Sequence, residues 1–307
     1  MHALHPRARR AGLLAPVALA AAGAVLLVGG PGGPLPGGAA DRYRAGERAS
    51  ERTILPGEAA TTVRARGLAR ARSLGVPVGS GTVVSRVTDR FIAAELDEVV
   101  TTDVNGRRLG IVRMARDGRL QMAVRLGWRD PTGGRIDESA ARARATALAE
   151  ESGVAGDGTA TVAPAADGGW RVTWERVADG VPVLGDGTAV TLFEDGTFHA
   201  AARRERPLAA APGELLAQPS VRRIAGERLA DLLGPAGAQA RIERSRLAWV
   251  APNDTFDSHA PDAPDPVLRL AWVVEVGTVA PLSDRFEALE LYLDAGNGSL
   301  LGGDLLR

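Results

Sequence analysis

The feature that most constrains this fold is a series of Asp-Gly and Asn-Gly dipeptides, which begin at positions 105, 117, 157, 167, 179, 186, 195 and 297. Such pairs supply the positive φ values that tight hairpin turns need. Between two of them, Trp170, Val172 and Trp174 alternate with polar residues, as in a strand with one buried face. Short hairpins favour antiparallel meanders over the long crossovers of a parallel sheet. We expect a two-residue type I′ turn at Asp195-Gly196.

Three stretches with apolar residues at helical spacing lie between these strands, at 57–75, 137–153 and 220–234. Each stretch ends at a glycine, which is Gly75, Gly153 or Gly234. Glycine is favoured just past a helix C-terminus because it adopts a left-handed conformation without strain. The sequence therefore predicts three helices.

The glycines that end these helices recur at nearly constant spacing, which indicates an internal repeat. The Asp-Gly pairs at 117 and 195 lie equally far beyond Gly75 and Gly153. We call the ungapped shift that places Gly75 on Gly153 the repeat shift. It aligns Val112, Met114 and Leu120 with Val190, Leu192 and Phe198, and it aligns Ile92, Ala94 and Leu96 with Trp170, Val172 and Trp174. The third copy would carry two insertions, a Pro- and Asp-rich loop at 251–266 and an irregular segment at 277–285.

The predicted fold class is α+β, with two to three tandem modules that each pack one helix on an antiparallel meander. The predicted modules are 57–132, which is degenerate, 133–212, and 213–307 with the loop insertion 251–266. Whether they form one sheet or separate cores stays open.

Composition excludes several kinds of chemistry. The chain of 307 residues has 37 basic and 37 acidic residues, no cysteine and no lysine. Disulfides, thiolate catalysis, Cys-ligated zinc and lysine Schiff bases are therefore impossible. The balanced charge provides no electrostatic footprint for nucleic acid.

The N-terminus predicts export. A basic segment at 5–10 precedes an uncharged apolar run at 11–28, and small residues at 38–40 precede Asp41. The run is long enough for a membrane span, so 1–40 is either a cleaved signal peptide or a retained anchor. Arg9-Arg10 also matches a twin-arginine signal weakly. Both alternatives place the body outside the cytoplasm, after a linker at 41–56.

The segments 170–174, 179–183 and 190–196, together with 289–304, resemble the PepSY and FTP-like propeptide modules of thermolysin- and fungalysin-type metallopeptidases. The resemblance covers 135–307 well and the first module poorly. It implies a cystatin/PepSY-like fold that accompanies or inhibits a peptidase. The peptidase itself needs His-Glu-x-x-His on a helix, whereas the histidines here are His2, His5, His199 and His259. The resemblance therefore implies a companion module without the enzyme.

We expect no catalytic, metal or cofactor site. His199 is expected to be a solvated or half-exposed strand residue. His259 lies in the acidic loop with Asp254, Asp257, Asp262 and Asp265, which suggests a hard-cation site but lacks regular ligand spacing. The acids Glu95, Asp97, Asp103, Glu287 and Glu290 do not define a glycosidase pair, and the stripe of Trp170, Trp174 and Trp272 is expected in the core rather than in a groove.

The leading hypothesis is an exported, non-catalytic protein that binds a protein partner, such as a peptidase, without contacting nucleic acid. Its expected contact is a sheet edge at Val181, Pro182 and Val183, because Pro182 has no N–H to donate to a neighbouring strand. The alternatives are a membrane-anchored extracytoplasmic regulator of a sensor kinase, and an unrecognised hydrolase.

Overall fold

The computed structural model describes residues 52–89, 92–126, 133–156, 158–165, 168–234, 237, 240–253, 266–277 and 288–306. Within these ranges each helix is followed by four strands along the chain. The elements are β1 (Arg52–Ile54), α2 (Gly57–Ser73), β2 (Gly81–Asp89), β3 (Ala94–Thr102), β4 (Arg108–Met114), β5 (Leu120–Arg125), α3 (Glu138–Ser152), β6 (Ala160–Pro164), β7 (Trp170–Ala178), β8 (Val181–Leu192), β9 (Phe198–Arg204), α4 (Gln218–Leu233), β10 (Arg241–Val250), β11 (Arg269–Gly277), β12 (Ala288–Asp294) and β13 (Leu300–Leu306).

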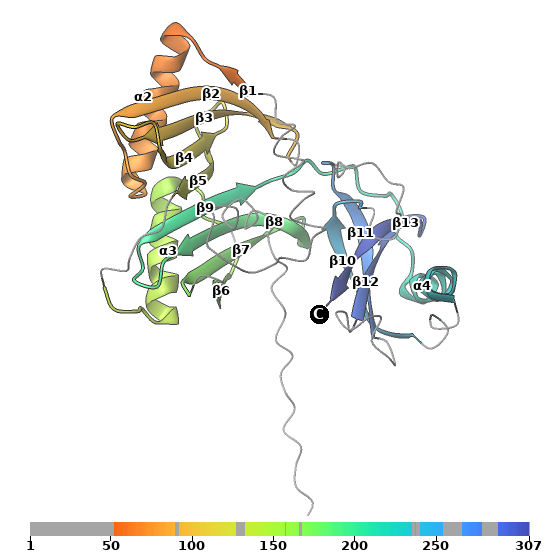
Figure 1. The fold of residues 1–307 in the computed structure, drawn as a ribbon. Coiled ribbons are helices and arrows are strands. Elements are labelled where there is room, and N and C mark those ends of the chain that lie inside the picture. The colour runs from red at the N-terminus through yellow and green to blue at the C-terminus, as the bar shows by residue number, and fades with distance from the viewer. Residues whose placement is uncertain are drawn as a thin grey trace, which may run out of the picture.

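The strands form one mixed, mainly antiparallel sheet, in the order β1-β2-β3-β4-β5-β9-β8-β10-β11-β12-β13. Strand β7 pairs with β8 outside this path, and β6 pairs with β7. With three helices beside a large antiparallel sheet, the α+β prediction is confirmed. Figure 1 shows that α2 and α3 cover the same face of strands β1–β9, which we call the N-terminal lobe, while α4 covers strands β10–β13, the C-terminal lobe.

The helices form where the sequence predicts them. Helix α3 begins after Asp137, whose carboxylate accepts a hydrogen bond from the Ala140 N–H at 2.8 Å, and it ends at left-handed Gly153. Helix α2 lies unusually close to the sheet at Gly67, where an added Cβ would lie 2.4 Å from a methyl carbon of Val99. Only glycine allows that approach.

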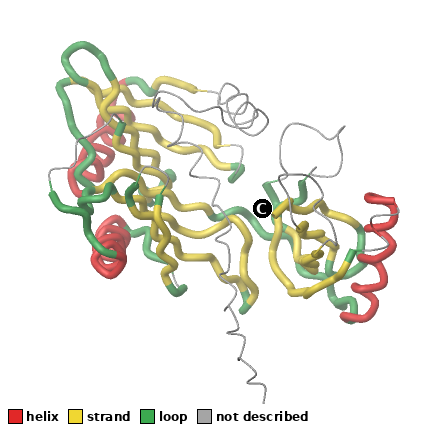
Figure 2. Tube along the Cα trace, turned by 60° about the horizontal axis from the view of Figure 1, so that its bottom comes forward, coloured by secondary structure: helices red, strands yellow, loops and turns green. Residues whose placement is uncertain are grey.

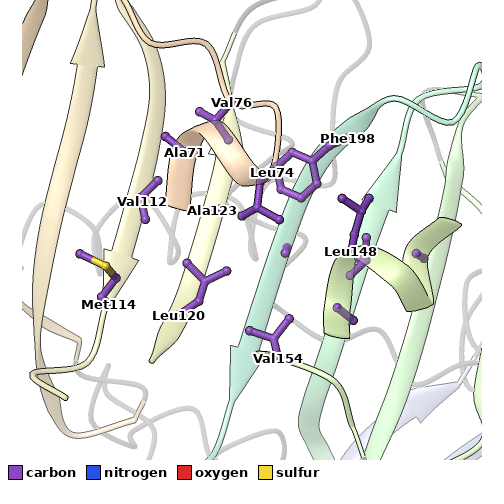
Figure 3. Packing of buried hydrophobic residues seen from close by; sticks show 14 of the residues in the cluster. Ala71, Leu74, Val76, Val112, Met114, Leu120, Ala123, Leu148, Val154 and Phe198 are labelled. Carbon is purple, nitrogen blue, oxygen red and sulfur yellow. The ribbon is translucent and has the colours of Figure 1, made fainter. Parts of the chain in front are cut away.

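One hydrophobic core underlies both helices of the N-terminal lobe. Figure 3 shows residues from the end of α2, from α3 and from β4, β5 and β9 in this cluster, with Leu74 beside Phe198. Trp174 is buried here and Trp170 packs against the same cluster, so the prediction that these tryptophans belong to the core is confirmed.

The C-terminal lobe has its own core. Trp272, Val274 and Val276 pair across β11 and β12 with Leu293, Leu291 and Leu289, and all six pack beneath α4. The opposite face of these strands carries a second apolar cluster that includes Val273 and Tyr292. Figure 2 shows the lobe as a curled sheet with α4 beside it.

The repeat shift relates local hydrogen bonds in the two halves of the N-terminal lobe. At the helix ends, the Val76 N–H donates to Ala71 O at 2.8 Å, and the Val154 N–H donates to Ala149 O at 2.8 Å. In the hairpins, Met114 pairs with Leu120 and Leu192 pairs with Phe198, each next to a β-bulge.

The two halves join through β5 and β9 in a pairing that is itself symmetric under this shift. Met122 pairs with Ala202, Ala123 with Ala201, and Val124 with Ala200. Since 122 and 200, 123 and 201, and 124 and 202 are equivalent under the shift, exchanging the halves reproduces the same pairs. The β5–β9 seam therefore has a local pseudo-twofold axis at Ala123 and Ala201.

Three sequence-based expectations are wrong in detail. Asp195 does not have a positive φ, so the type I′ turn is instead at Asp179-Gly180, with φ values of 51° and 78°. Leu96 pairs with Val87, on the face opposite the one that carries Val99 and the helices, so it does not occupy the position of Trp174. The end of the expected linker 41–56 forms β1, which pairs with β2.

Candidate functional site

In the segment Val181–Val183, which was expected to be an open edge, the last residue, Val183, lies inside the sheet. Val183 pairs with Arg176 of β7 on one side and with Trp249 of β10 on the other, and it is 1% exposed. The expectation of an open edge is therefore wrong for Val183, because its backbone already has two neighbours. Whether Val181 and Pro182 contact a partner stays a prediction.

Strand β8 changes neighbours at a buried ion cluster centred on Asp186. Its carboxylate accepts hydrogen bonds from the Arg206 backbone N–H at 2.6 Å and from the Arg206 Nε at 2.7 Å, and Arg176 approaches it at 3.3 Å. Asp186 is fully buried, so these arginines compensate a charge that water cannot reach. The cluster holds the Gly185-Asp186-Gly187 bulge. Before this bulge Val183 pairs with β10, and from Gly187 onward β8 pairs with β9.

Strand β6 is the edge of this part of the described sheet, because it pairs with β7 alone (Figure 1). The Ala165 N–H donates to Gly169 O at 2.9 Å, and in an antiparallel ladder the bonded pairs then alternate. Val162 therefore points its N–H and C=O away from β7. The outward C=O of Ala160 is already bonded to Arg142 at 2.9 Å.

Strand β13 ends the sheet in the C-terminal lobe, but Asn253 covers much of its outer edge. The Asn253 side chain accepts from the Gly303 N–H at 3.0 Å and donates to the Gly303 C=O at 3.1 Å. Its backbone N–H also donates to Leu301 O at 2.8 Å. Asn253 thus takes the place of a neighbouring strand and blocks further pairing there.

The face of the C-terminal lobe opposite α4 carries a row of carboxylates. Glu275, Glu290 and Asp304 are directly opposite one another on β11, β12 and β13. Arg246 pairs with buried Glu290 at 3.0 Å, and the Tyr292 hydroxyl donates to Asp304.

Burial and mutual repulsion shift the protonation of this row. Burial raises the pKa of Glu290, and Arg246 opposes that shift only in part. The surrounding protein also raises the pKa of Asp304, although its side chain stays exposed to solvent, and the Tyr292 hydroxyl lowers it. Burial and Asp304 raise the pKa of Tyr292 well above its usual value, so the phenol stays protonated and donates its hydrogen bond.

A second fully buried carboxylate, Glu98, lies on the face of the N-terminal lobe opposite the helices. It contacts Arg52 at 2.9 Å, Arg113 at 2.8 Å and the Ser85 hydroxyl at 3.3 Å. A hollow of about 120 Å³ lies beside it, lined also by Val83. Because β1 supplies Arg52, the group fastens that short strand to the sheet.

A cleft of about 400 Å³ lies between the end of α2, the middle of α3 and the β8–β9 turn. Arg72 and Arg144 line it from the two helices, and Asp195 and Phe198 line it from the turn. Sequence reasoning missed this site because its walls come from segments that are distant along the chain.

The other predicted site residues are not brought together. His199 is half-buried and stacks on Phe193 with ring centroids 4.5 Å apart, as expected of a strand residue. The acidic loop with His259 and its four aspartates, as well as Glu287 and the segment 1–40, lies outside the described residues. In the described ranges, no three His, Asp or Glu side chains could together hold a metal ion.

Glu95, Asp97 and Asp103 each have different interaction partners and do not form a common site. Glu95 pairs with Arg116, Asp97 pairs with Arg86 at 3.2 Å, and Asp103 accepts from backbone N–H groups of its own turn. None of the helices that the structure describes is long and apolar enough to span a membrane.

Comparisons with known proteins show no family for this chain. No family model matches the sequence, and no curated protein matches it. Among solved structures, the fold is similar to the Bacillus megaterium YpeB C-terminal domain, with a TM-score of 0.37 and 14% identity over 83% of this chain and 99% of that one. The resemblance to PepSY and FTP-like modules therefore stays a prediction.

Proposed function

We propose that this chain is an exported, non-catalytic binding protein of tandem propeptide-like modules, and that it modulates or inhibits a peptidase. The observation that carries the proposal is the outer edge of β6, which lies beside the helix-covered core and points the Val162 N–H and C=O outward. An extended peptide segment can add to such an edge through main-chain hydrogen bonds. This edge takes the place of Val183, whose backbone already has neighbours on both sides.

Two features of the described molecule support this proposal. Each helix is followed by four antiparallel strands, which is the arrangement expected of the predicted modules. The buried carboxylates Asp186 and Glu98 are both neutralised by arginines, so they hold strands together rather than serve as reactive groups.

The test is affinity capture with the immobilised chain from the extracellular proteins of its source organism. We expect a peptidase to be recovered and its turnover to change when the chain is added. The variant Val162→Pro should lose the capture, since proline removes the outward N–H and none of the N–H groups that bond to β7. Because Val162 also packs against the core, the substitution is expected to lower the thermal stability as well. Val162→Thr keeps that N–H and serves as the matched control.

Recovery of no protein partner by a normally folded chain would overturn the proposed function. If Val162→Pro captures the peptidase as well as the unmodified chain does, the function stands and the β6 contact is wrong. Thermal unfolding of both variants shows that the comparison is made between folded proteins.

A second function is favoured by the length of the apolar run at 11–28, which suffices for a span. In this alternative the chain stays anchored and its extracytoplasmic modules contact the sensor domain of a kinase. N-terminal sequencing of the exported protein separates the two functions, because a new terminus near Asp41 contradicts the anchor.

A further inference from the structure

We propose that the cleft between α2, α3 and the β8–β9 turn binds a carboxylate side chain within an acidic peptide segment of a protein partner. We call it the arginine cleft, after Arg72 and Arg144. The inference rests on the proposed function, since it assumes a protein partner, but it concerns a different surface from the β6 edge.

Both guanidinium groups of the arginine cleft are available to a ligand. Arg72 and Arg144 are exposed, and neither makes an ion pair or hydrogen bond with any side chain that the structure describes. In the same helices, Arg70 donates to the Glu151 carbonyl and Arg142 pairs with Glu138. Unlike Arg70 and Arg142, the two arginines that line the hollow have no partner among the described side chains.

The C-terminus of α2 repels an anion less strongly than a helix C-terminus whose carbonyl groups lack hydrogen-bond donors. The last carbonyl groups of a helix carry partial negative charge when they lack donors. In α2, Ala71 O accepts from the Val76 N–H at 2.8 Å, and Arg72 O accepts from the Gly75 N–H at 3.1 Å. These bonds satisfy the carbonyl groups of Ala71 and Arg72 and so reduce the negative charge at this helix end.

The pseudo-twofold relation provides an internal comparison. Under the repeat shift, Arg144 corresponds to Arg66 and the 195–198 turn corresponds to 117–120. Arg66 lies across Gly118, with its Cδ 2.9 Å from where a Cβ would be, and it donates to the Arg116 carbonyl. One arginine thus lies against its own half's turn, whereas its counterpart Arg144 faces an open cleft.

The second arginine of the cleft breaks the symmetry as well. Arg72 corresponds under the same shift to Glu150, so the counterpart site has an acid in its place. The open cleft therefore combines two unpaired cations, while the counterpart combines one bonded arginine with a carboxylate. This difference in charge points to an anionic ligand for the open cleft alone.

The shape of a carboxylate suits the two arginines of the cleft. Asp195 of the β8–β9 turn also lines the cleft, and its carboxylate accepts a hydrogen bond from the Thr197 N–H at 2.9 Å. A side-chain carboxylate presents its two oxygens in one plane, which matches the planar fork of a guanidinium group. Each guanidinium can bind such a carboxylate through two parallel hydrogen bonds.

The test is calorimetric titration of the full chain with acetyl-tetra-aspartate amide as probe, and with acetyl-tetra-asparagine amide and inorganic phosphate in parallel. We expect the aspartate peptide to bind and the other two to bind at least about tenfold more weakly. The double variant Arg72→Gln, Arg144→Gln should weaken the peptide by about tenfold or more. The matched control is Arg64→Gln, Arg222→Gln, which removes the same charge from exposed arginines elsewhere.

The proposed role of the arginine cleft is overturned if the aspartate peptide does not bind, or if both double variants lose the same amount of affinity for it. Equal or tighter binding of phosphate overturns the assignment to a peptide. If the captured peptidase binds the Arg72→Gln, Arg144→Gln chain as tightly as the unmodified chain, the proposed function survives and this inference fails. Unchanged thermal midpoints of both double variants show that the losses do not come from unfolding.

Discussion

At the residue scale, the fold depends on a few carboxylates that water cannot reach. Asp186 is the clearest case, because it accepts two hydrogen bonds from Arg206 where β8 leaves the N-terminal lobe. Removing one partner of a buried pair leaves the other charge uncompensated. Such residues determine which strands can be neighbours.

We predict that Asp186→Ala destabilises the chain by about 3–5 kcal/mol, because Arg206 is left buried and unpaired. Asp117→Ala, which breaks the exposed pair with Arg119, should cost much less, because solvent screens an exposed ion pair. Chemical denaturation measures both free energies of unfolding. A loss at Asp186 no larger than the loss at Asp117 would show that the cluster is not structural.

The carboxylate row of the C-terminal lobe predicts a pH dependence. Glu290 and Asp304 have pKa values raised above their unfolded values, so the folded state holds their protons to higher pH. These groups therefore contribute stability that is fully present below their unfolded pKa values, near 4, and is lost as the pH rises from there through their higher folded pKa values.

We expect Asp304→Asn to raise the thermal midpoint at about pH 7, and to change it little at about pH 3, where the unmodified carboxyl is protonated. The Tyr292 hydroxyl can still donate to the asparagine oxygen. Glu150→Gln, on the exposed face of α3, is the control. A midpoint at neutral pH that falls in Asp304→Asn would contradict the raised pKa.

At the scale of elements, the contact of α2 with the sheet depends on a missing side chain. An added Cβ at Gly67 overlaps Val99, whereas one at Gly226 of α4 meets nothing within 4 Å. We predict that Gly67→Ala destabilises by about 1–3 kcal/mol despite its better helix propensity. Gly226→Ala should stabilise by up to about 1 kcal/mol. Equal effects in denaturant melts would mean that α2 shifts freely.

Local chemistry predicted the helices, because Gly75 and Gly153 end them through bonds within a few residues. It also predicted the paired faces of β11 and β12. It failed where a distant residue decides the conformation. The Gly185-Asp186-Gly187 segment was interpreted as a turn, but Arg206, far along the chain, holds it as a bulge inside β8.

The candidate sites were less predictable for the same reason. Nothing near Val162 in sequence indicates that β6 is an edge, since its neighbours are set by the order of the whole sheet. The arginine cleft likewise joins residues that are distant along the chain, such as Arg72 and Phe198. The repeat shift predicted the hairpins correctly, but it misplaced Leu96 because β3 and β7 are connected to the next strand differently.

At the scale of the whole molecule, the two lobes share little backbone pairing. Trp249 and Val183 form the one described strand pair between β10 and β8, and a small cluster around Leu268 and Leu270 packs beside it. Each lobe has its own core beneath its own helices. Such lobes can unfold separately.

We predict two transitions in calorimetric melting of the full chain. The variant Leu229→Ala, which truncates a buried residue of α4, should lower only one of them, at a cost of about 2–5 kcal/mol to the C-terminal lobe. Leu148→Ala in α3 should lower the other. A single transition shifted by both variants would show that the lobes unfold as one unit.

The β5–β9 seam also sets an order of events during synthesis. Ala201 is added to the chain one full repeat after Ala123, its partner at the centre of the seam. At typical rates of synthesis, this delay is about 4–16 s. During this delay β5 has already been synthesised, but β9, the strand that pairs with its edge, has not. Since the seam is pseudo-symmetric, the surface that most closely matches the waiting strand is the same strand of a second nascent chain.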